Sequence, residues 1–278
     1  NHAGLFCSLK DATVENLVID SSCSFNGYSA GALCVSVNGS LVVRNVTNKA
    51  HVSGIKRVGS FVGSVLDLRD VSVSFDDCVN DGTIIGNIYY VGGFVGCIED
   101  NTIMAVTISN STNNGIVNGV HDCGGFVGFF GRNTNVTMTI SNSTNNGNVT
   151  GSVFVGGFVG WVARNTNIVM TISNSTNNGN DVRSITHVGG FVGDISSNTN
   201  MTTIISNSIN NGSITSTNTQ NNNAGGFVGL VYSDSHSNSI SLSIINSVNK
   251  GSVSAKSEMA CGVFCVNPKY NININTTI

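Results

Sequence analysis

The sequence predicts an all-β protein, a parallel β-solenoid of about eight to nine coils with roughly 32 residues and three short strands in each coil. A motif returns along the whole chain, as GSFVG at 59–63, as GGFVG at 92–96, 124–128, 156–160, 189–193 and 225–229, and as degenerate copies at 3–7, 30–34 and 261–265. A recurrence of about 20 to 50 residues is typical of solenoids, in which each unit buries its apolar side against its neighbours. Composition agrees, because 33 Gly and abundant Asn, Ser and Thr disfavour long helices.

The middle of each unit alternates strictly between apolar and polar residues. Val136, Met138 and Ile140 are separated by Thr137 and Thr139, and the same phase occurs at 104–108, 168–172 and 240–244. Period-two alternation predicts a strand with one buried face. The Asn-Asn-Gly that follows, at 113–115 for example, predicts a turn because Asn and Gly tolerate positive φ. A short strand then leads to the next motif.

Two columns of stacked side chains are expected inside the coils. The phenylalanines of the motif should stack as an aromatic column. The asparagine after the inward isoleucine falls on the inward phase, so we expect a buried ladder of side-chain amides that bond from coil to coil. These residues are Phe94, Phe126, Phe158, Phe191 and Phe227 for the aromatic column, and Asn110, Asn142, Asn174, Asn207 and Asn246 for the ladder.

The repeat predicts one solenoid domain over 1–278. Residues 1–58 form degenerate N-terminal coils, 59–260 the regular repeats, and 261–278 a C-terminal coil or cap. The chain opens without Met, and a repeat is already in phase at residue 3, so we expect it to be a piece of a longer protein.

Charge and motifs exclude several classes of function. The net charge is -3 and the 12 Lys and Arg residues are scattered, so we expect no nucleic-acid partner. No apolar run reaches the roughly 18 residues that span a membrane. GGFVG lacks the Lys and Ser or Thr of a phosphate-binding loop, and neither HExxH nor a paired CxxC occurs. We therefore expect no cofactor, no metal and no enzymatic activity.

Two of the eight cysteines are candidates for a disulfide. Cys7 and Cys34 occupy the last position of successive motif copies. Stacking would place their backbones about 4.8 Å apart, within the usual range for a disulfide. Two small buried hydrophobic side chains fit the same pattern.

Ten Asn-x-Ser/Thr sequons suggest glycosylation if the protein is secreted from a eukaryotic cell. The repeat composition also generates sequons by chance. Asn110, Asn142 and Asn174 should be inward and bare. The best acceptor candidates are Asn135, Asn148, Asn200, Asn38 and Asn45.

The order GGFVG, a polar stretch, Ile-Ser-Asn-Ser-x-Asn-Asn-Gly and then Val resembles the GLUG repeat. The match is clearest at Gly92–Val117, Gly124–Val149, Gly156–Gly179 and Gly189–Ile214, and Phe replaces the usual aliphatic residue of the motif. The resemblance implies a β-solenoid stalk or adhesive module of a secreted or surface-attached protein. It transfers no catalytic residue.

We therefore expect a non-enzymatic, extracellular or cell-surface repeat protein that acts as an adhesin module or structural stalk. Other proteins or surface glycans would bind the variable bends, such as Val182–His187 and Thr215–Asn223, and the chain could also associate with itself. Arg132 and Arg164 fall on the same bend and mark an exposed rim.

Three alternatives stay open. One is a scaffold inside a larger filament or assembly. A second is a solenoid carbohydrate-active enzyme that uses Asp76, Asp77 and Asp81, since paired carboxylates can cleave glycosidic bonds or bind calcium. The third is an ice-binding solenoid with a flat array of hydroxyls, Thr137, Thr139, Thr171 and Ser243.

Overall fold

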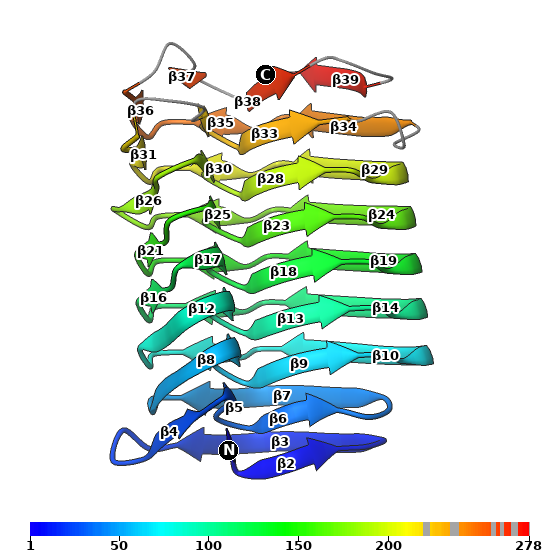
Figure 1. Ribbon diagram of the computed structural model, residues 1–278, viewed down its shortest axis with the longest axis vertical. Coiled ribbons are helices and arrows are strands. Elements are labelled where there is room, and N and C mark those ends of the chain that lie inside the picture. Colours follow the sequence, from blue (N-terminus) through cyan, green and yellow to red (C-terminus); the bar gives the residue numbers. More distant parts are fainter. Residues whose placement is uncertain (219–222, 234–238, 257–259, 262–263, 268–271, 278) are drawn as a thin grey trace.

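The chain folds into a stack of parallel β-coils (Figure 1), which confirms the predicted fold class. The computed structural model describes all residues except 219–222, 234–238, 257–259, 262–263, 268–271 and 278. Each coil passes through three sheets, here called A, B and C. Sheet B has nine strands, one per coil, which agrees with the expected eight to nine coils. The described residues form no helix, so none of them belongs to a helix able to cross a bilayer.

Each strand of sheet B begins inside a motif copy and continues past it. Its strands are β2 (Phe6–Leu9), β6 (Cys34–Val37), β9 (Val62–Leu66), β13 (Val95–Glu99), β18 (Val127–Gly131), β23 (Val159–Ala163), β28 (Val192–Ser196), β33 (Val228–Tyr232) and β38 (Phe264–Asn267).

Sheet C holds the long alternating strands and the short strands after the Asn-rich bend. Its strands are β3 (Ala12–Ile19), β7 (Leu41–Asn48), β10 (Arg69–Asp76), β11 (Val79–Asn80), β14 (Thr102–Ser109), β15 (Thr112–Asn113), β19 (Thr134–Ser141), β20 (Thr144–Asn145), β24 (Thr166–Ser173), β25 (Thr176–Asn177), β29 (Thr199–Ser206), β30 (Ile209–Asn210), β34 (Ile240–Ile245), β35 (Val248–Asn249) and β39 (Ile272–Thr277).

Sheet A leads from the bend back to the next motif. Its strands are β1 (His2–Ala3), β4 (Ser24–Gly27), β5 (Ser29–Gly31), β8 (His51–Gly59), β12 (Ile84–Gly92), β16 (Val117–Asn118), β17 (His121–Gly124), β21 (Val149–Thr150), β22 (Phe154–Gly156), β26 (Val182–Ser184), β27 (His187–Gly189), β31 (Ile214–Ser216), β32 (Asn223–Gly225), β36 (Val253–Ala255) and β37 (Ala260–Cys261).

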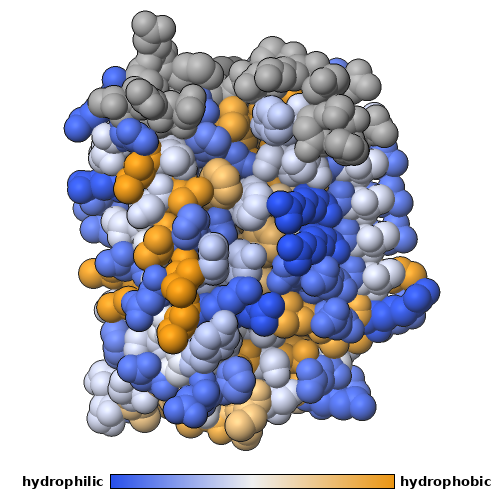
Figure 2. All heavy atoms as spheres, viewed as in Figure 1, coloured by the Kyte–Doolittle hydropathy of each residue, from blue (hydrophilic) through white to orange (hydrophobic). Residues whose placement is uncertain are grey.

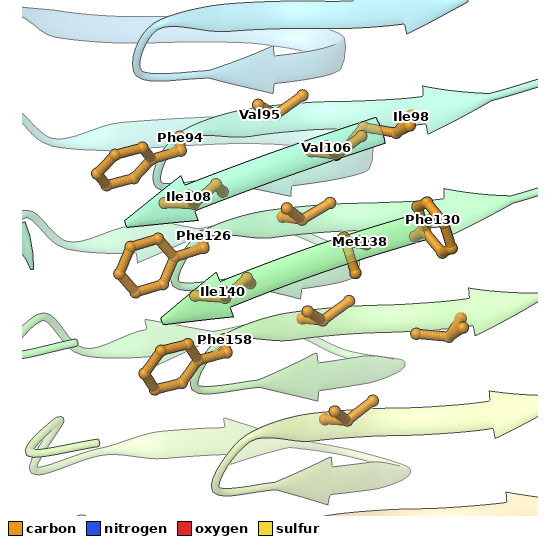
Figure 3. Packing of buried hydrophobic residues seen from close by; sticks show 14 of the residues in the cluster. Phe94, Val95, Ile98, Val106, Ile108, Phe126, Phe130, Met138, Ile140 and Phe158 are labelled. Atoms are coloured by element: carbon orange, nitrogen blue, oxygen red, sulfur yellow. The ribbon is translucent and has the colours of Figure 1, made fainter. Parts of the chain in front are cut away.

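The motif phenylalanines stack in one buried column. Ring centroids from Phe94 to Phe126, Phe158, Phe191 and Phe227 are successively 4.7, 4.9, 4.6 and 5.2 Å apart, with nearly parallel rings. Valine, isoleucine, methionine and phenylalanine side chains of sheets B and C pack beside this column, as Figure 3 shows for two neighbouring layers. Burial of these apolar side chains in every coil is the main source of stability.

The second glycine of the motif is required by close contact between coils. A Cβ on Gly125 would lie 2.1 Å from the Gly157 carbonyl oxygen and 2.6 Å from the Asn145 side chain. Gly93 and Gly157 have equivalent contacts. Since no real Cβ fits at these distances, only glycine allows the motif to pack against this column of asparagines.

A buried asparagine ladder exists, but its predicted position is wrong by three residues. The ladder runs through Asn48, Asn80, Asn113, Asn145, Asn177, Asn210 and Asn249, with Nδ2 to Oδ1 distances of 3.2, 2.7, 2.7, 2.9, 2.7 and 2.7 Å. The predicted members, Asn110, Asn142, Asn174, Asn207 and Asn246, are exposed and have φ of 48–50°. This left-handed residue shifts the alternation, so Ser111 and Asn113 turn inward instead.

A second buried ladder closes the bend between sheets B and C. Asn101, Asn133, Asn165 and Asn198 donate from Nδ2 to the next Oδ1 at 3.1, 3.2 and 3.0 Å. Each acceptor oxygen also takes the backbone N–H of the preceding coil's asparagine. An amide side chain suits this role because it carries a donor and an acceptor, so identical residues satisfy one another along the stack.

The predicted Cys7–Cys34 disulfide is wrong. Strand pairing sets Phe6, not Cys7, opposite Cys34. Cys7 is exposed and Cys34 is buried, and both are free thiols. Neighbouring residues in a strand point to opposite faces, so a register difference of one residue separates the two side chains.

The division into degenerate and regular coils stays a prediction. The expected C-terminal coil, 261–278, lies partly outside the described residues, although β39 pairs in register with β34.

We predict that Asn145→Ala lowers the free energy of unfolding by about 2–3 kcal/mol, because it removes the buried amide bonds that Asn145 makes with Asn113 Nδ2 and with Asn177 Oδ1 in the neighbouring coils. The neighbouring Asn146→Ala removes an exposed ladder member and should cost at most about 0.5 kcal/mol. Urea unfolding measures both variants. Equal losses would contradict the role of the buried ladder.

Candidate functional site: the outer face of sheet B

The outer face of sheet B carries side chains that differ from coil to coil. The residue two places after the motif's valine points outward in register from coil to coil, as Cys97, Phe129, Trp161 and Asp194. A second row lies over them and consists of the residue two places before the motif, namely Arg57, Tyr90, Asp122, Phe154 and His187. Together with Glu99, these two rows are called the outer strip.

A backbone bend brings the second row over the sheet. Arg57, Tyr90 and Asp122 have φ of 62°, 61° and 56°, so the chain turns sharply just before these three motif copies. The last glycine of the motif permits the crossing, since a Cβ on Gly96 would lie 2.6 Å from the Val58 backbone nitrogen. Because the second row crosses over the outer face of sheet B, the side chains of the first row are largely buried although they lie outside the core.

Aromatic rings form the middle of the outer strip. Tyr90 stacks on Phe129 with centroids 4.6 Å apart and an interplanar angle of 12°. Trp161 packs against Phe129 at 5.1 Å and against Phe154 at 4.9 Å, and its Nε1 donates to Ser196 Oγ at 2.9 Å. Arg164 lies 5.9 Å from the Trp161 ring, within the range of a cation–π contact.

A buried carboxylate organises one end of the strip. Glu99 is 3% exposed and pairs with Arg132 at 2.8 Å and with Arg57 at 3.6 Å. The Cys97 thiol lies 3.6 Å from Glu99 Oε2, and burial raises the pKa of this thiol well above its usual value. The protonated thiol is a poor nucleophile, so the group is structural.

A histidine and two buried aspartates form the other end. His187 Nδ1 lies 2.7 Å from Asp194 Oδ2, while Oδ1 of Asp194 and Oδ1 of Asp122 are buried without a hydrogen bond in the described structure. Burial, with the nearby Asp194 charge, raises the pKa of Asp122 well above its usual range. A His–Asp pair can orient an imidazole for catalysis, but among the described hydrogen bonds the His187 ring contacts only Asp194.

The predicted acidic patch does not form a reactive site. Asp76 accepts hydrogen bonds from Ser109 Oγ at 2.6 Å and Asn110 Nδ2 at 2.9 Å, which lower its pKa. Asp81 accepts from Asn114 Nδ2 at 2.8 Å, and Asp77 is an exposed bend residue. Within the described chain no group of three His, Cys, Asp or Glu side chains is placed to hold a metal ion. Asp77 lies in the exposed column that also holds Asn45 and Asn110, and Asp81 bonds to the first asparagine of the column that continues with Asn146.

The glycosylation candidates lie on the surface, and their modification stays a prediction. Asn38, Asn45, Asn135 and Asn200 are exposed and Asn148 is half-buried. Asn110, Asn142 and Asn174, expected to be inward, are exposed as well, so burial does not distinguish the two groups. Asn200 Nδ2, the atom that would carry a glycan, donates to Asn167 Oδ1 at 3.1 Å.

Sequence reasoning missed the outer strip, although a signal was present. The residue two places before GGFVG and the residue directly after it are large or charged in most units. A repeat whose side chains only packed against their copies would keep one residue type at each of these positions. Period-two alternation does not decide which way the residue after the motif faces, because the adjacent Phe94 and Val95 are both in the core and set opposite phases.

The comparisons with known proteins give one finding. No family model matches the chain, so the GLUG resemblance is not confirmed in this way, and no curated protein matches it. A solved structure of a candidate immunoglobulin A1 protease from Bacteroides ovatus is similar, with a TM-score of 0.43 and 12% identity over 91% of this chain and 83% of that chain.

The expectation that the chain is not an enzyme is corrected on this finding, because the similar structure is that of a candidate protease. At this identity and TM-score, the similarity assigns no activity, substrate or residue to the chain.

We predict that Asp122 makes the protein less stable as pH rises. A carboxyl whose folded pKa is raised binds its proton more tightly in the folded state, so stability falls as pH rises above the unfolded pKa of about 3.9. The urea midpoint of Asp122→Asn relative to the wild type should therefore increase between pH 4 and pH 7. A relative midpoint that stays constant would show that this carboxyl titrates normally.

Proposed function

We propose that this chain is the rigid β-solenoid part of an extracellular or cell-surface protein, and that it acts in adhesion or as a stalk with the outer face of sheet B as its contact surface. The observation that carries the proposal is the concentration of partly exposed aromatic and basic side chains, among them Tyr89, Trp161 and Arg164, on one long side of a rod. Tyr, Trp and Arg are the residues enriched at the energetic centres of protein interfaces.

The GLUG-like order of the repeat supports the same role, because the resemblance implies a surface stalk or adhesive module. A stack of in-register coils is stiff along its length, since each coil is hydrogen-bonded to the next by three sheets and two buried asparagine ladders. Such a rod can hold a contact surface away from whatever carries it.

The other candidate functions lack a supporting observation. The carboxylates of Asp76 and Asp81 are engaged with the next coil, which does not favour a glycosidase at this patch. The hydroxyl array for ice binding is interrupted, because Thr137 pairs with Val169 and Thr171 with Ile204. A scaffold inside a larger assembly is an outcome of the test below.

The proposal predicts that an antibody raised against this chain labels intact, unpermeabilised cells of the source organism, and that external protease removes the label. Beads coated with the chain should bind those cells, and beads coated with the Trp161→Ala variant should bind less. An antibody against an abundant cytosolic protein controls for intact membranes. Labelling only after permeabilisation would contradict the surface role and favour the internal scaffold.

A further inference from the structure

A ridge of exposed apolar side chains runs along the edge of the outer strip. It consists of Ile55 (39% exposed), Ile88 (42%), Tyr89 (40%), Val120 (38%) and Ile185 (43%), which precede the motif in four of five successive coils. Figure 2 shows hydrophobic residues in a band along the long axis on this side of the molecule. Contiguous exposed apolar residues of this kind mark interaction sites on soluble proteins.

A column of exposed charges borders the same face at the opposite end of the sheet B strands. It is formed by the left-handed bend residue after each strand and reads Asp67, Asp100, Arg132, Arg164 from coil to coil. The backbone of each bend residue bonds to the next coil, so the column is straight. Two acidic coils are therefore followed by two basic coils.

Two charges of the column are poorly compensated within the chain. Arg132 pairs with Glu99, but Arg164 forms no ion pair with any described residue and has only its contact with Trp161. Burial and the neighbouring Glu99 raise the pKa of Asp100, so a further cation beside it would be favourable.

We propose that two copies of the chain associate antiparallel through the outer face of sheet B, with the two-fold axis at the coil that starts at Gly124. A two-fold axis perpendicular to the rods places ridge on ridge and charge column on charge column while it reverses the order of the coils. Asp100 then faces the partner's Arg164, and Ile55 faces the partner's Ile185. Val120 and Arg132 lie near the axis, where Glu99 neutralises Arg132.

The charge order favours a second copy in this orientation over other arrangements. A column that is acidic at one end and basic at the other is complementary to itself only when reversed. A parallel copy face to face would set the apolar ridge of one chain against the charges of the other. The pairing uses the same face that the proposed function takes as the contact surface, with a second copy of the chain as the partner, and it is tested in solution without reference to a cell surface.

Charge reversal tests the pairing. The wild type should sediment as a dimer at high micromolar concentration, whereas Asp100→Arg and Arg164→Asp should each weaken the dimer by at least about tenfold in Kd, because both copies then oppose like charges. An equimolar mixture of the two variants should form heterodimers, since Arg at 100 meets Asp at 164 and Arg164 meets Asp100. The chain with both substitutions should dimerise like the wild type.

Two controls locate the effect. Asp70→Arg makes the same charge change at an exposed residue outside the column and should leave the dimer intact. Ile88→Asp should weaken the dimer, whereas Val169→Asp, at an equally exposed valine of sheet C, should not. The fluorescence of Trp161, the single tryptophan, follows association on dilution.

A monomeric wild type, or a mixture of the two variants that stays monomeric, would overturn the proposal. Restoration in the mixture also excludes misfolding as the cause of dissociation, because an unfolded chain cannot complement its partner. Equal weakening by Val169→Asp would place the interface on another face.

Discussion

The in-register parallel pairing of successive coils is the constraint on which the rest of the structure depends. Val95 pairs with Val127 and Val127 with Val159, so every side chain lies beside its equivalent in the next repeat. At the motif phenylalanine and at the ladder asparagine, the buried residue packs against a copy of itself in coil after coil. Phenylalanine does so by stacking, and asparagine does so by bonding amide to amide.

The same constraint explains where charged residues occur. A buried column of identical charges would be unstable, so most charges lie on bends open to solvent or meet an opposite charge, and burial raises the pKa of Asp122, the one buried carboxyl of the described residues without such a partner. Glu99 is the clearest case, because it is buried between Arg57 and Arg132 from other coils. The outer strip is thus the part of the described structure where the repeat is broken, and a contact surface needs such individual side chains.

The sequence predicts the solenoid well because its signals are repeated in every unit. Spacing of GGFVG gives the coils, alternation at Val136–Ile140 gives the long strand, and the motif phenylalanines form a stacked column. Which side chains turn inward after a bend is harder to predict from the sequence. One left-handed residue, such as Asn110, exchanges the inward and outward positions of the strand that follows. That single effect moved the expected ladder from Asn110 to Asn113. The outer strip needs contacts between side chains about 33 residues apart, such as Arg132 with Glu99, which no local pattern contains.

The central claim is that a buried, coil-to-coil asparagine ladder fixes the register of the rod. NMR measurement of hydrogen exchange at the side-chain amides tests this claim directly. The Nδ2 protons of Asn113, Asn145 and Asn177 should exchange far more slowly than those of the exposed Asn114, Asn146 and Asn178, because only the first set is sealed inside the coils. Equally fast exchange in both sets would contradict the buried ladder and the register built on it.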